Sequence, residues 1–307
     1  MTSVPPPAYV HPGPPPDRPE RPEGLPPLVE GADAWKPWSA WVAVVAALTV
    51  PIVFGIVAGL GVAIAGGDLT DMPAGVLIAL TFLQDVGFIA VPLLIASWIA
   101  SRPTARDFGL RVPERKWRAV GLIAAVYLGF IVLSAIWVGV LGIDEKDSLP
   151  DELGVKDSSL NLILVLLLVT MVAPVAEEML FRGYMFRALR NWKGVWPAAL
   201  LSGMTFGGIH LGSSPVGFVV PLMVFGVGLA LLYQWTGSLY APVALHALNN
   251  SIAFGATQDW EWQIPVTIAG SVTASLLALW LLARFLGPRV PAKPSPRPDD
   301  VSAAFGA

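Results

Sequence analysis

Apolar runs of about 20 residues recur along the middle of this 307-residue chain. A helix needs about 20 consecutive apolar residues to cross the hydrocarbon core of a bilayer. Only 13% of the residues are charged, against roughly 25% in an average soluble domain, and so little charge cannot cover a soluble surface of this size. The sequence therefore predicts an all-α fold, a polytopic membrane helical bundle, and excludes soluble folds.

About eight transmembrane helices are expected. The first apolar run begins only after a proline-rich stretch, so it does not look like a cleavable signal peptide. We therefore expect it to stay in the mature protein as a span. The eight expected spans are approximately Trp38–Ala65, Gly75–Ala100, Ala119–Gly142, Ser159–Phe186, Val195–Leu211, Gly217–Gln234, Leu239–Gly255 and Ile264–Leu286.

Both ends of the chain are rich in proline. Residues 1–37 contain twelve prolines, which favours extended or disordered backbone with nothing to bury. A proline-directed binding segment is the alternative interpretation of this tail. Residues 288–307 have a similar composition, so we expect two disordered cytoplasmic tails.

Lys and Arg are concentrated on one side of the expected spans. Seventeen of the nineteen fall in the N-terminal tail, the 101–118 loop, the 182–193 segment and the C-terminal end, whereas Lys146 and Lys156 fall on the other side. Cytoplasmic loops carry an excess of basic residues. We therefore expect a multi-pass protein of the cell (plasma) membrane with both termini in the cytoplasm. Thirteen Arg against six Lys, with abundant Ala, Val, Gly and Pro, indicate a bacterial source.

Composition also excludes several function classes. The net charge of −3 gives no basic face for nucleic acid, and no nucleic-acid motif is present. The chain has no cysteine, which rules out disulfides, a thiolate nucleophile and Cys-x-x-Cys metal sites. The expected partners are the lipid bilayer and a membrane-associated protein or peptide substrate.

Ionisable side chains inside the expected spans are few. Such a group costs roughly 2.5–3.5 kcal/mol near the bilayer centre, so each is a functional hypothesis by default. Three short stretches hold most of the polar candidates, and Asp85, beside Gln84, stands apart from them. The candidates in these stretches are Glu177, Glu178, Arg182, His210, His246 and Asn250.

Helical spacing orders these candidates. Glu178 and Arg182 are four residues apart, so they share a helix face and are able to form an ion pair. Glu177 is rotated by roughly 100° from Glu178 and is free to face a cavity. His246 and Asn250 are also four apart and present an imidazole and an amide from one stripe of a helix.

Three functions are compatible with these residue types. Carboxylates, imidazoles and an amide in a dry cleft are able to activate water and stabilise an oxyanion, as peptide hydrolysis requires. The same groups would suit a proton or ion pathway, in a proton-coupled transporter that uses Glu177, Glu178 and Asp85. They would also suit interhelical hydrogen bonds in a non-catalytic membrane partner protein.

Several other hydrolase chemistries lack their motifs. No His-Glu-x-x-His is present for a helix-borne zinc site, and no Gly-x-Ser-x-Gly for a serine nucleophile. No second span carries an aspartate that would pair with Asp85 in an aspartyl dyad. Asp85 with Gln84 is therefore interpreted as a polar interhelical contact.

Three motifs occur in order: Glu-Glu-x-x-x-Arg at 177–182, Phe-x-x-x-His at 206–210 and His-x-x-x-Asn at 246–250. Together they resemble the CPBP intramembrane protease family, which includes CAAX prenyl endopeptidases and bacteriocin-processing, Abi-like proteins. The resemblance covers roughly Ser159–Gly255. It implies an intramembrane endopeptidase in which Glu177 activates water with His210, while His246 and Asn250 stabilise the oxyanion.

The resemblance divides the chain into five parts and leaves the metal question open. Between the tails 1–37 and 288–307 lie three spans in 38–158, the peptidase core in 159–255 and the last span in 256–287. No cofactor is certain, although Glu177, His210 and His246 would form a three-ligand site for a divalent metal such as zinc. Whether or not a metal is bound, helix tilt or a break at Gly207-Gly208 must bring His210 to the same depth in the membrane as Glu177.

Overall fold

The structure is a computed structural model that describes residues 35–68, 72–99, 103–144 and 148–287. The predicted tails 1–37 and 288–307 fall almost entirely outside these residues. Within them, the regular structure is helical apart from one isolated bridge between Leu211 and Ser214. This confirms the predicted all-α class.

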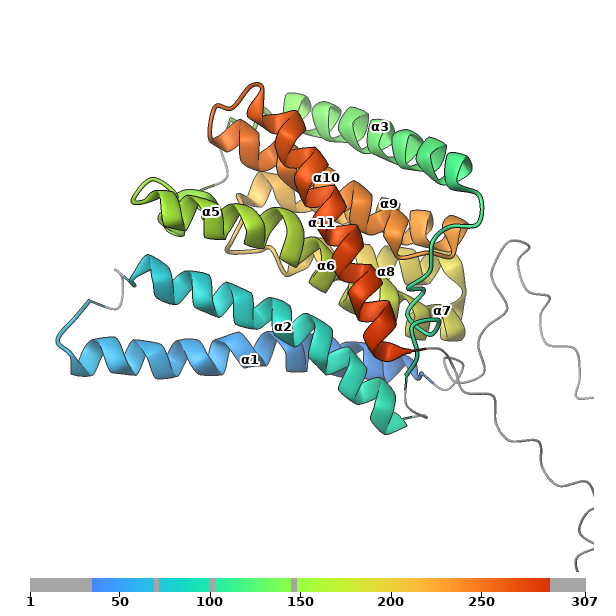
Figure 1. The fold of residues 1–307 in the computed structure, drawn as a ribbon, viewed down its shortest axis with the longest axis horizontal. Helices are drawn as coiled ribbons and strands as arrows, with labels where there is room; N and C mark the ends of the chain where they lie inside the picture. Colours follow the sequence, from blue (N-terminus) through green and yellow to red (C-terminus); the bar gives the residue numbers. More distant parts are fainter. Residues whose placement is uncertain (1–34, 69–71, 100–102, 145–147, 288–307) are drawn as a thin grey trace, which may run out of the picture.

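The helices are packed side by side in a bundle (Figure 1). A continuous helical segment from Ser159 to Lys193 contains two π-helical turns, η2 and η3. The elements in chain order are α1 (Pro37–Ile64), α2 (Ala74–Ile99), α3 (Lys116–Leu141), α4 (Leu149–Glu152), α5 (Ser159–Leu167), η2 (Leu168–Val172), α6 (Ala173–Glu178), η3 (Met179–Phe186), α7 (Arg187–Lys193), α8 (Val195–Gly208), α9 (Val216–Thr236), α10 (Tyr240–Thr257) and α11 (Gln263–Leu286).

Six helical segments of the described chain are long and apolar enough to cross a membrane: α1, α2, α3, the segment from α5 to α7, α9 and α11. The predicted spans Val195–Leu211 and Leu239–Gly255 correspond to α8 and α10, which are not among the six. Helix α8 has 14 residues, so it is about 21 Å long and shorter than the hydrocarbon core of roughly 30 Å. The predicted count of eight spans is therefore not confirmed.

The outer helices expose apolar side chains. In α3 only 6% of the most apolar window is buried inside the bundle, whereas in α9 the share is 50%. An exposed surface of this kind is stable in lipid and unfavourable in water. The protein is accordingly a multi-pass membrane protein, with α9 near the centre of the bundle and α3 at its periphery.

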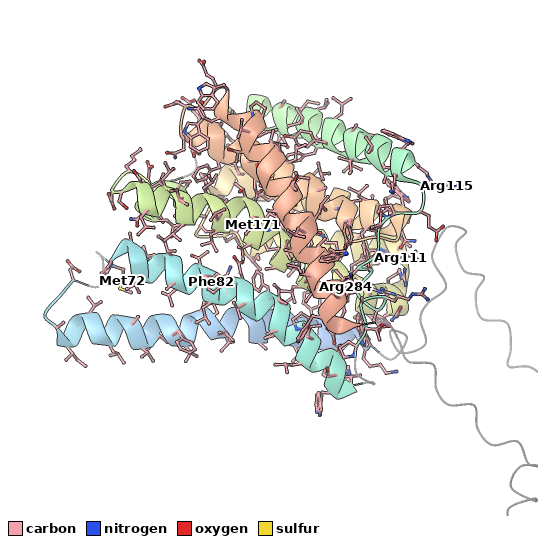
Figure 2. The ribbon with its side chains drawn as sticks, viewed as in Figure 1. Met72, Phe82, Arg111, Arg115, Met171 and Arg284 are labelled. Atoms are coloured by element: carbon pink, nitrogen blue, oxygen red, sulfur yellow. The ribbon has the colours of Figure 1, made fainter. Side chains whose placement is uncertain are left out.

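One end of the bundle, which we call the basic end, is organised by the segment 103–112. Ala105 N–H donates to the carbonyl of Gly287 at 3.5 Å, and the ring of Phe108 packs against Trp35 with centroids 5.2 Å apart. The first and last parts of the described chain therefore lie at the same end. Figure 2 shows Arg111, Arg115 and Arg284 there, with Met72 at the opposite end.

Candidate active site

The first motif lies in an irregular part of the long helical segment. Glu177 and Glu178 end the short helix α6, which lies between the π-helical turns η2 and η3. Pro174 stands near the start of α6 and has no N–H to continue a regular ladder. π-Helical turns are frequent at functional sites. Here the two π-helical turns flank both glutamates, which lie near the middle of a 35-residue helical segment.

Glu178 and Arg182 form a buried ion pair, which confirms the pairing predicted from their spacing. Arg182 Nη1 lies 2.7 Å from Glu178 Oε1, and both side chains are fully buried. Arg182 Nη2 also donates to the Gly226 carbonyl of α9 at 3.0 Å. The guanidinium lies 4.5 Å from the centroid of the Phe206 ring, so this charge is balanced and held by three elements.

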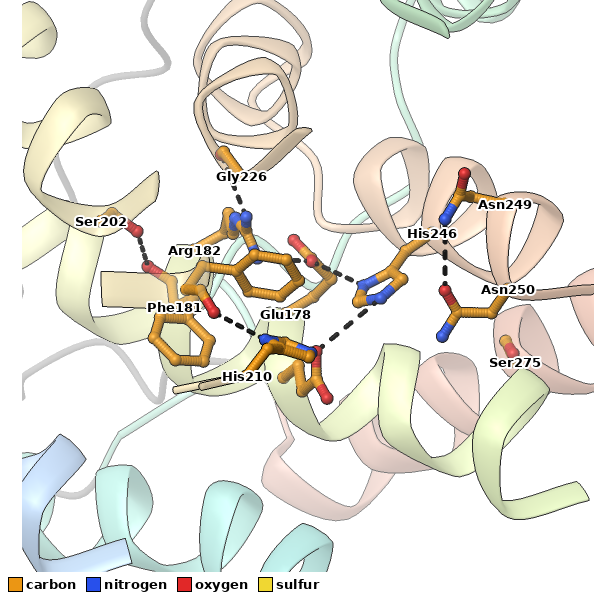
Figure 3. A network of polar contacts seen from close by, with 12 residues as sticks. Glu178, Phe181, Arg182, Ser202, His210, Gly226, His246, Asn249, Asn250 and Ser275 are labelled. Carbon is orange, nitrogen blue, oxygen red and sulfur yellow. Dashed lines mark hydrogen bonds and ion pairs between the residues drawn. The ribbon is translucent and has the colours of Figure 1, made fainter. Parts of the chain in front are cut away.

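His246 of α10 connects the two glutamates (Figure 3). Its Nδ1 lies 3.0 Å from Glu178 Oε1, and its Nε2 lies 3.7 Å from Glu177 Oε2. A carboxylate oxygen only accepts hydrogen bonds, so His246 Nδ1 carries the hydrogen and donates it to Glu178. The aromatic rings of Phe206 and Phe225 meet the imidazole edge to face, so the buried ring is held by two aromatic contacts and by Glu178.

A cavity of about 490 Å³ lies beside this network. Glu177 lines it, whereas Glu178, Arg182 and His246 do not and lie behind Glu177. Glu177 Oε2 is buried and accepts no hydrogen bond from any described residue. The other polar lining residues are Thr81, Gln84, Asp85, His210, Ser213, Ser214, Asn249, Asn250 and Thr257.

His210 reaches the cavity because α8 ends early. Helix α8 stops at Gly208, and the following turn carries His210, whose Nδ1 donates to the Phe206 carbonyl at 2.7 Å. A carbonyl only accepts, so Nδ1 carries the hydrogen of this bond. The break predicted at Gly207-Gly208 is thus the end of the helix, and it brings His210 into the cavity that Glu177 lines.

Close packing of α8 on α9 fixes this turn. A Cβ at Gly207 would lie 2.7 Å from Met223 N and 2.8 Å from Val219 O. At Gly203, one turn earlier, a Cβ would meet Val227 N at 2.6 Å. Small residues four apart let membrane helices approach closely, so these glycines position the end of α8 against α9.

Asn250 faces the cavity from α10. One of its Nδ2 hydrogens is donated to the carbonyl of Val169 at 3.0 Å, in the π-helical turn η2, so the amide has one further donor. Asn249, which the sequence reasoning did not select, lines the same cavity and donates to Asn250 Oδ1 at 3.4 Å. The sequence signal that could have identified Asn249 is the adjacent pair Asn-Asn inside the expected span Leu239–Gly255.

Asp85 and Gln84 line the cavity from α2. The carboxyl of Asp85 is 1% exposed, and its Oδ2 has no hydrogen bond within the described part of the chain. The interpretation as an interhelical contact understates this position, because α2 places Asp85 in the same cavity wall as Glu177.

The arrangement does not suit a three-ligand metal site. Within the described residues, no three His, Asp or Glu side chains are grouped so that they would hold a metal ion together. His246 directs Nδ1 to Glu178 and lies behind Glu177, so it does not share the cavity with His210. The candidate ligand set Glu177, His210 and His246 therefore does not fit, and we derive no step through a metal.

Two known proteins are similar to this chain. The chain is 29% identical over 172 residues to an uncharacterized 24.3 kDa protein of Escherichia coli, covering 54% of this chain and 75% of that protein. It is 30% identical over 89 residues to the uncharacterized protein YpbD of Bacillus subtilis, covering 28% of this chain and 42% of that protein. No solved structure matches the chain.

A sequence model of the Rce1-like family, described as type II CAAX prenyl endopeptidase Rce1-like, matches residues 159–252. This range contains all six candidate residues and nearly the whole of the predicted peptidase core. Residues 159–252 are therefore similar to the type II CAAX prenyl endopeptidase Rce1-like family, which agrees with the resemblance predicted from their three motifs.

Proposed function

We propose that the protein is an intramembrane endopeptidase that hydrolyses a peptide bond in a membrane-associated protein or peptide. The observation that carries this proposal is the polar cavity inside an apolar bundle, whose wall contains Glu177 together with His210, Asn249 and Asn250. The Rce1-like family match over the same residues supports it.

Glu177 is the proposed general base. Its carboxylate takes a proton from a water molecule in the cavity, and the resulting hydroxide attacks the carbonyl carbon of the scissile bond. When the tetrahedral intermediate collapses, the carbon–nitrogen bond breaks and Glu177 returns the proton to the leaving amine. His210 lines the same cavity, and its proposed role is to orient the attacking water.

The oxyanion of the intermediate requires hydrogen-bond donors. Asn250 and Asn249 present amide groups to the cavity, and the Nδ2 of Asn250 is oriented by its bond to Val169. Removing one oxyanion donor typically costs about 3–4 kcal/mol of barrier. The family resemblance gives His246 a share in this role, whereas in this geometry His246 lies behind Glu177, with its Nε2 3.7 Å from Glu177 Oε2.

The ion pair of Glu178 and Arg182 is the proposed support of the site. Glu178 accepts from both Arg182 and His246, so it balances the charge of Arg182 and orients the imidazole of His246. Supports of this kind keep the groups that contact substrate in a productive geometry.

Cells that express either the native chain or a Glu177→Ala variant provide the test, with membrane proteomes compared between the two. We expect at least one membrane protein or peptide to accumulate uncut in the variant. Glu261→Ala is the matched control, because Glu261 is an exposed carboxylate outside the cavity. Identical proteomes for Glu177→Ala and Glu261→Ala would reject the endopeptidase.

A further inference from the structure

The cavity extends from Glu177 toward the end of the bundle that lies opposite the basic end. Its wall includes Leu149 and Pro150 of α4, the turn from Ile209 to Ser214, and Thr257 at the last residue of α10. Leu211 of this turn is 61% exposed. The cavity therefore reaches the surface at this opposite end, where Figure 1 shows the last turn of α1 and the first turn of α2.

Toward the basic end, the site is closed by packed side chains. Every residue of η3, from Met179 to Phe186, is buried. Phe225, Leu229 and Leu232 of α9 fill the space beside it and are at most 1% exposed. The residues that line the cavity include none from the segment 103–112 or from α7, so the described structure offers no path from this end to Glu177.

Charge distinguishes the two ends. The described Lys and Arg residues of the basic end are Lys36, Arg106, Arg111, Arg115, Lys116, Arg118, Arg187, Arg190, Lys193 and Arg284. At the opposite end, Lys156 is the one described basic residue outside the buried site, and it pairs with Asp151 at 2.6 Å. The exposed acidic residues there are Asp68, Asp144, Asp151, Glu152, Asp157, Asp259 and Glu261.

We propose that the catalytic cavity opens on the non-cytoplasmic face of the membrane. Basic segments next to membrane helices stay in the cytoplasm, so the basic end is cytoplasmic and the cavity mouth faces the other side. Its substrates are then membrane proteins or peptides whose scissile bond lies at the non-cytoplasmic boundary of the bilayer. This inference rests on the proposed endopeptidase for its substrate class, whereas the direction of the opening does not depend on turnover.

Single cysteines in this cysteine-free chain test the opening. Ser213→Cys lies at the cavity mouth, Ala173→Cys lies in its wall one helical turn before Glu177, and Glu114→Cys reports the basic end. A membrane-impermeant thiol reagent is added to intact cells and, separately, to inverted membrane vesicles. Ala230→Cys, in α9, is the buried control, since Ala230 is fully buried.

We expect Ser213→Cys and Ala173→Cys to react in intact cells and to be protected in inverted vesicles, with Glu114→Cys showing the reverse pattern. Ala230→Cys should react in neither preparation. Labelling of Ala173→Cys from the same side as Glu114→Cys, from both sides, or from neither side would overturn the proposal. The same labelling is repeated with Glu177→Gln added, so a chain without peptidase activity still reports which face the cavity opens to.

Discussion

Glu177 and Glu178 are adjacent in the chain, yet the structure gives them opposite surroundings. Glu178 Oε1 accepts from Arg182 at 2.7 Å and from His246 at 3.0 Å, inside the bundle. Glu177 lines the cavity, with Oε2 at 3.7 Å from His246 Nε2. Replacing either by glutamine keeps the shape of the side chain and removes its negative charge, so the pair of variants separates catalysis from support.

Glu178→Gln should lower the free energy of unfolding. Removing one partner of a buried ion pair costs about 3–5 kcal/mol, because it leaves the other charge uncompensated. Arg182 keeps its hydrogen bond to Gly226 at 3.0 Å and its contact with the Phe206 ring. A hydrogen bond to a charged group retains about 1.5–3 kcal/mol, so we expect a loss near the lower limit, about 3 kcal/mol.

Glu177→Gln should leave the fold intact and stop the reaction. Its Oε2 has no hydrogen bond within the described structure, so the free energy of unfolding should change by less than about 1 kcal/mol. General-base catalysis contributes roughly 10²–10⁴ in rate, which corresponds to about 3–5 kcal/mol of barrier. The cleavage rate should therefore fall by at least 100-fold.

Both variants are purified in detergent, and the free energy of unfolding is measured by denaturant titration. Cleavage of the peptide that accumulates in Glu177→Ala cells is measured per folded molecule. Glu178→Gln should be less stable, with cleavage per folded molecule within about tenfold of the native chain, since glutamine still offers His246 an oxygen. A stable, active Glu177→Gln beside a folded but inactive Glu178→Gln would show that the two roles are reversed.

Further perturbations address the two histidines, the helix contact and metal. His210→Ala should reduce cleavage by at least about 100-fold with little change in melting temperature, because His210 is only half-buried, in the turn after α8. Normal cleavage would remove His210 from the mechanism. His246→Ala should reduce both cleavage and melting temperature, since its buried ring packs on two aromatic rings and Glu178; loss of stability alone would make it structural. Gly207→Ala should lower the free energy of unfolding by about 1–3 kcal/mol, because its Cβ would clash with Met223. Gly208→Ala should be neutral, because open space surrounds the position of its Cβ. Equal effects of the two variants would contradict the packing of α8 on α9. Exhaustive chelation should leave cleavage unchanged, and recovery of lost activity on adding zinc, at near-equimolar metal content, would require a metal site that this arrangement lacks.

The sequence by itself determined the fold class and the ion pair. Long apolar runs leave helices as the solution for a chain that buries its backbone in lipid, because every N–H and C=O must be bonded within the segment. The spacing of Glu178 and Arg182 placed them on one helix face, and two opposite charges on one face in an apolar interior form a pair. These are local consequences of helix geometry and solvent, so they need no tertiary information.

Only the tertiary structure decided which polar residues share a cavity. Asp85 and Asn249 enter it because α2 and α10 pack beside α6, and nothing near them in the sequence records that contact. His210 enters it because the packing of Gly207 on α9 fixes where α8 ends. His246 lies behind Glu177 because its ring is enclosed by residues from α8 and α9. The direction in which the cavity opens has the same origin, since it depends on which ends of separate helices are packed and which are left apart.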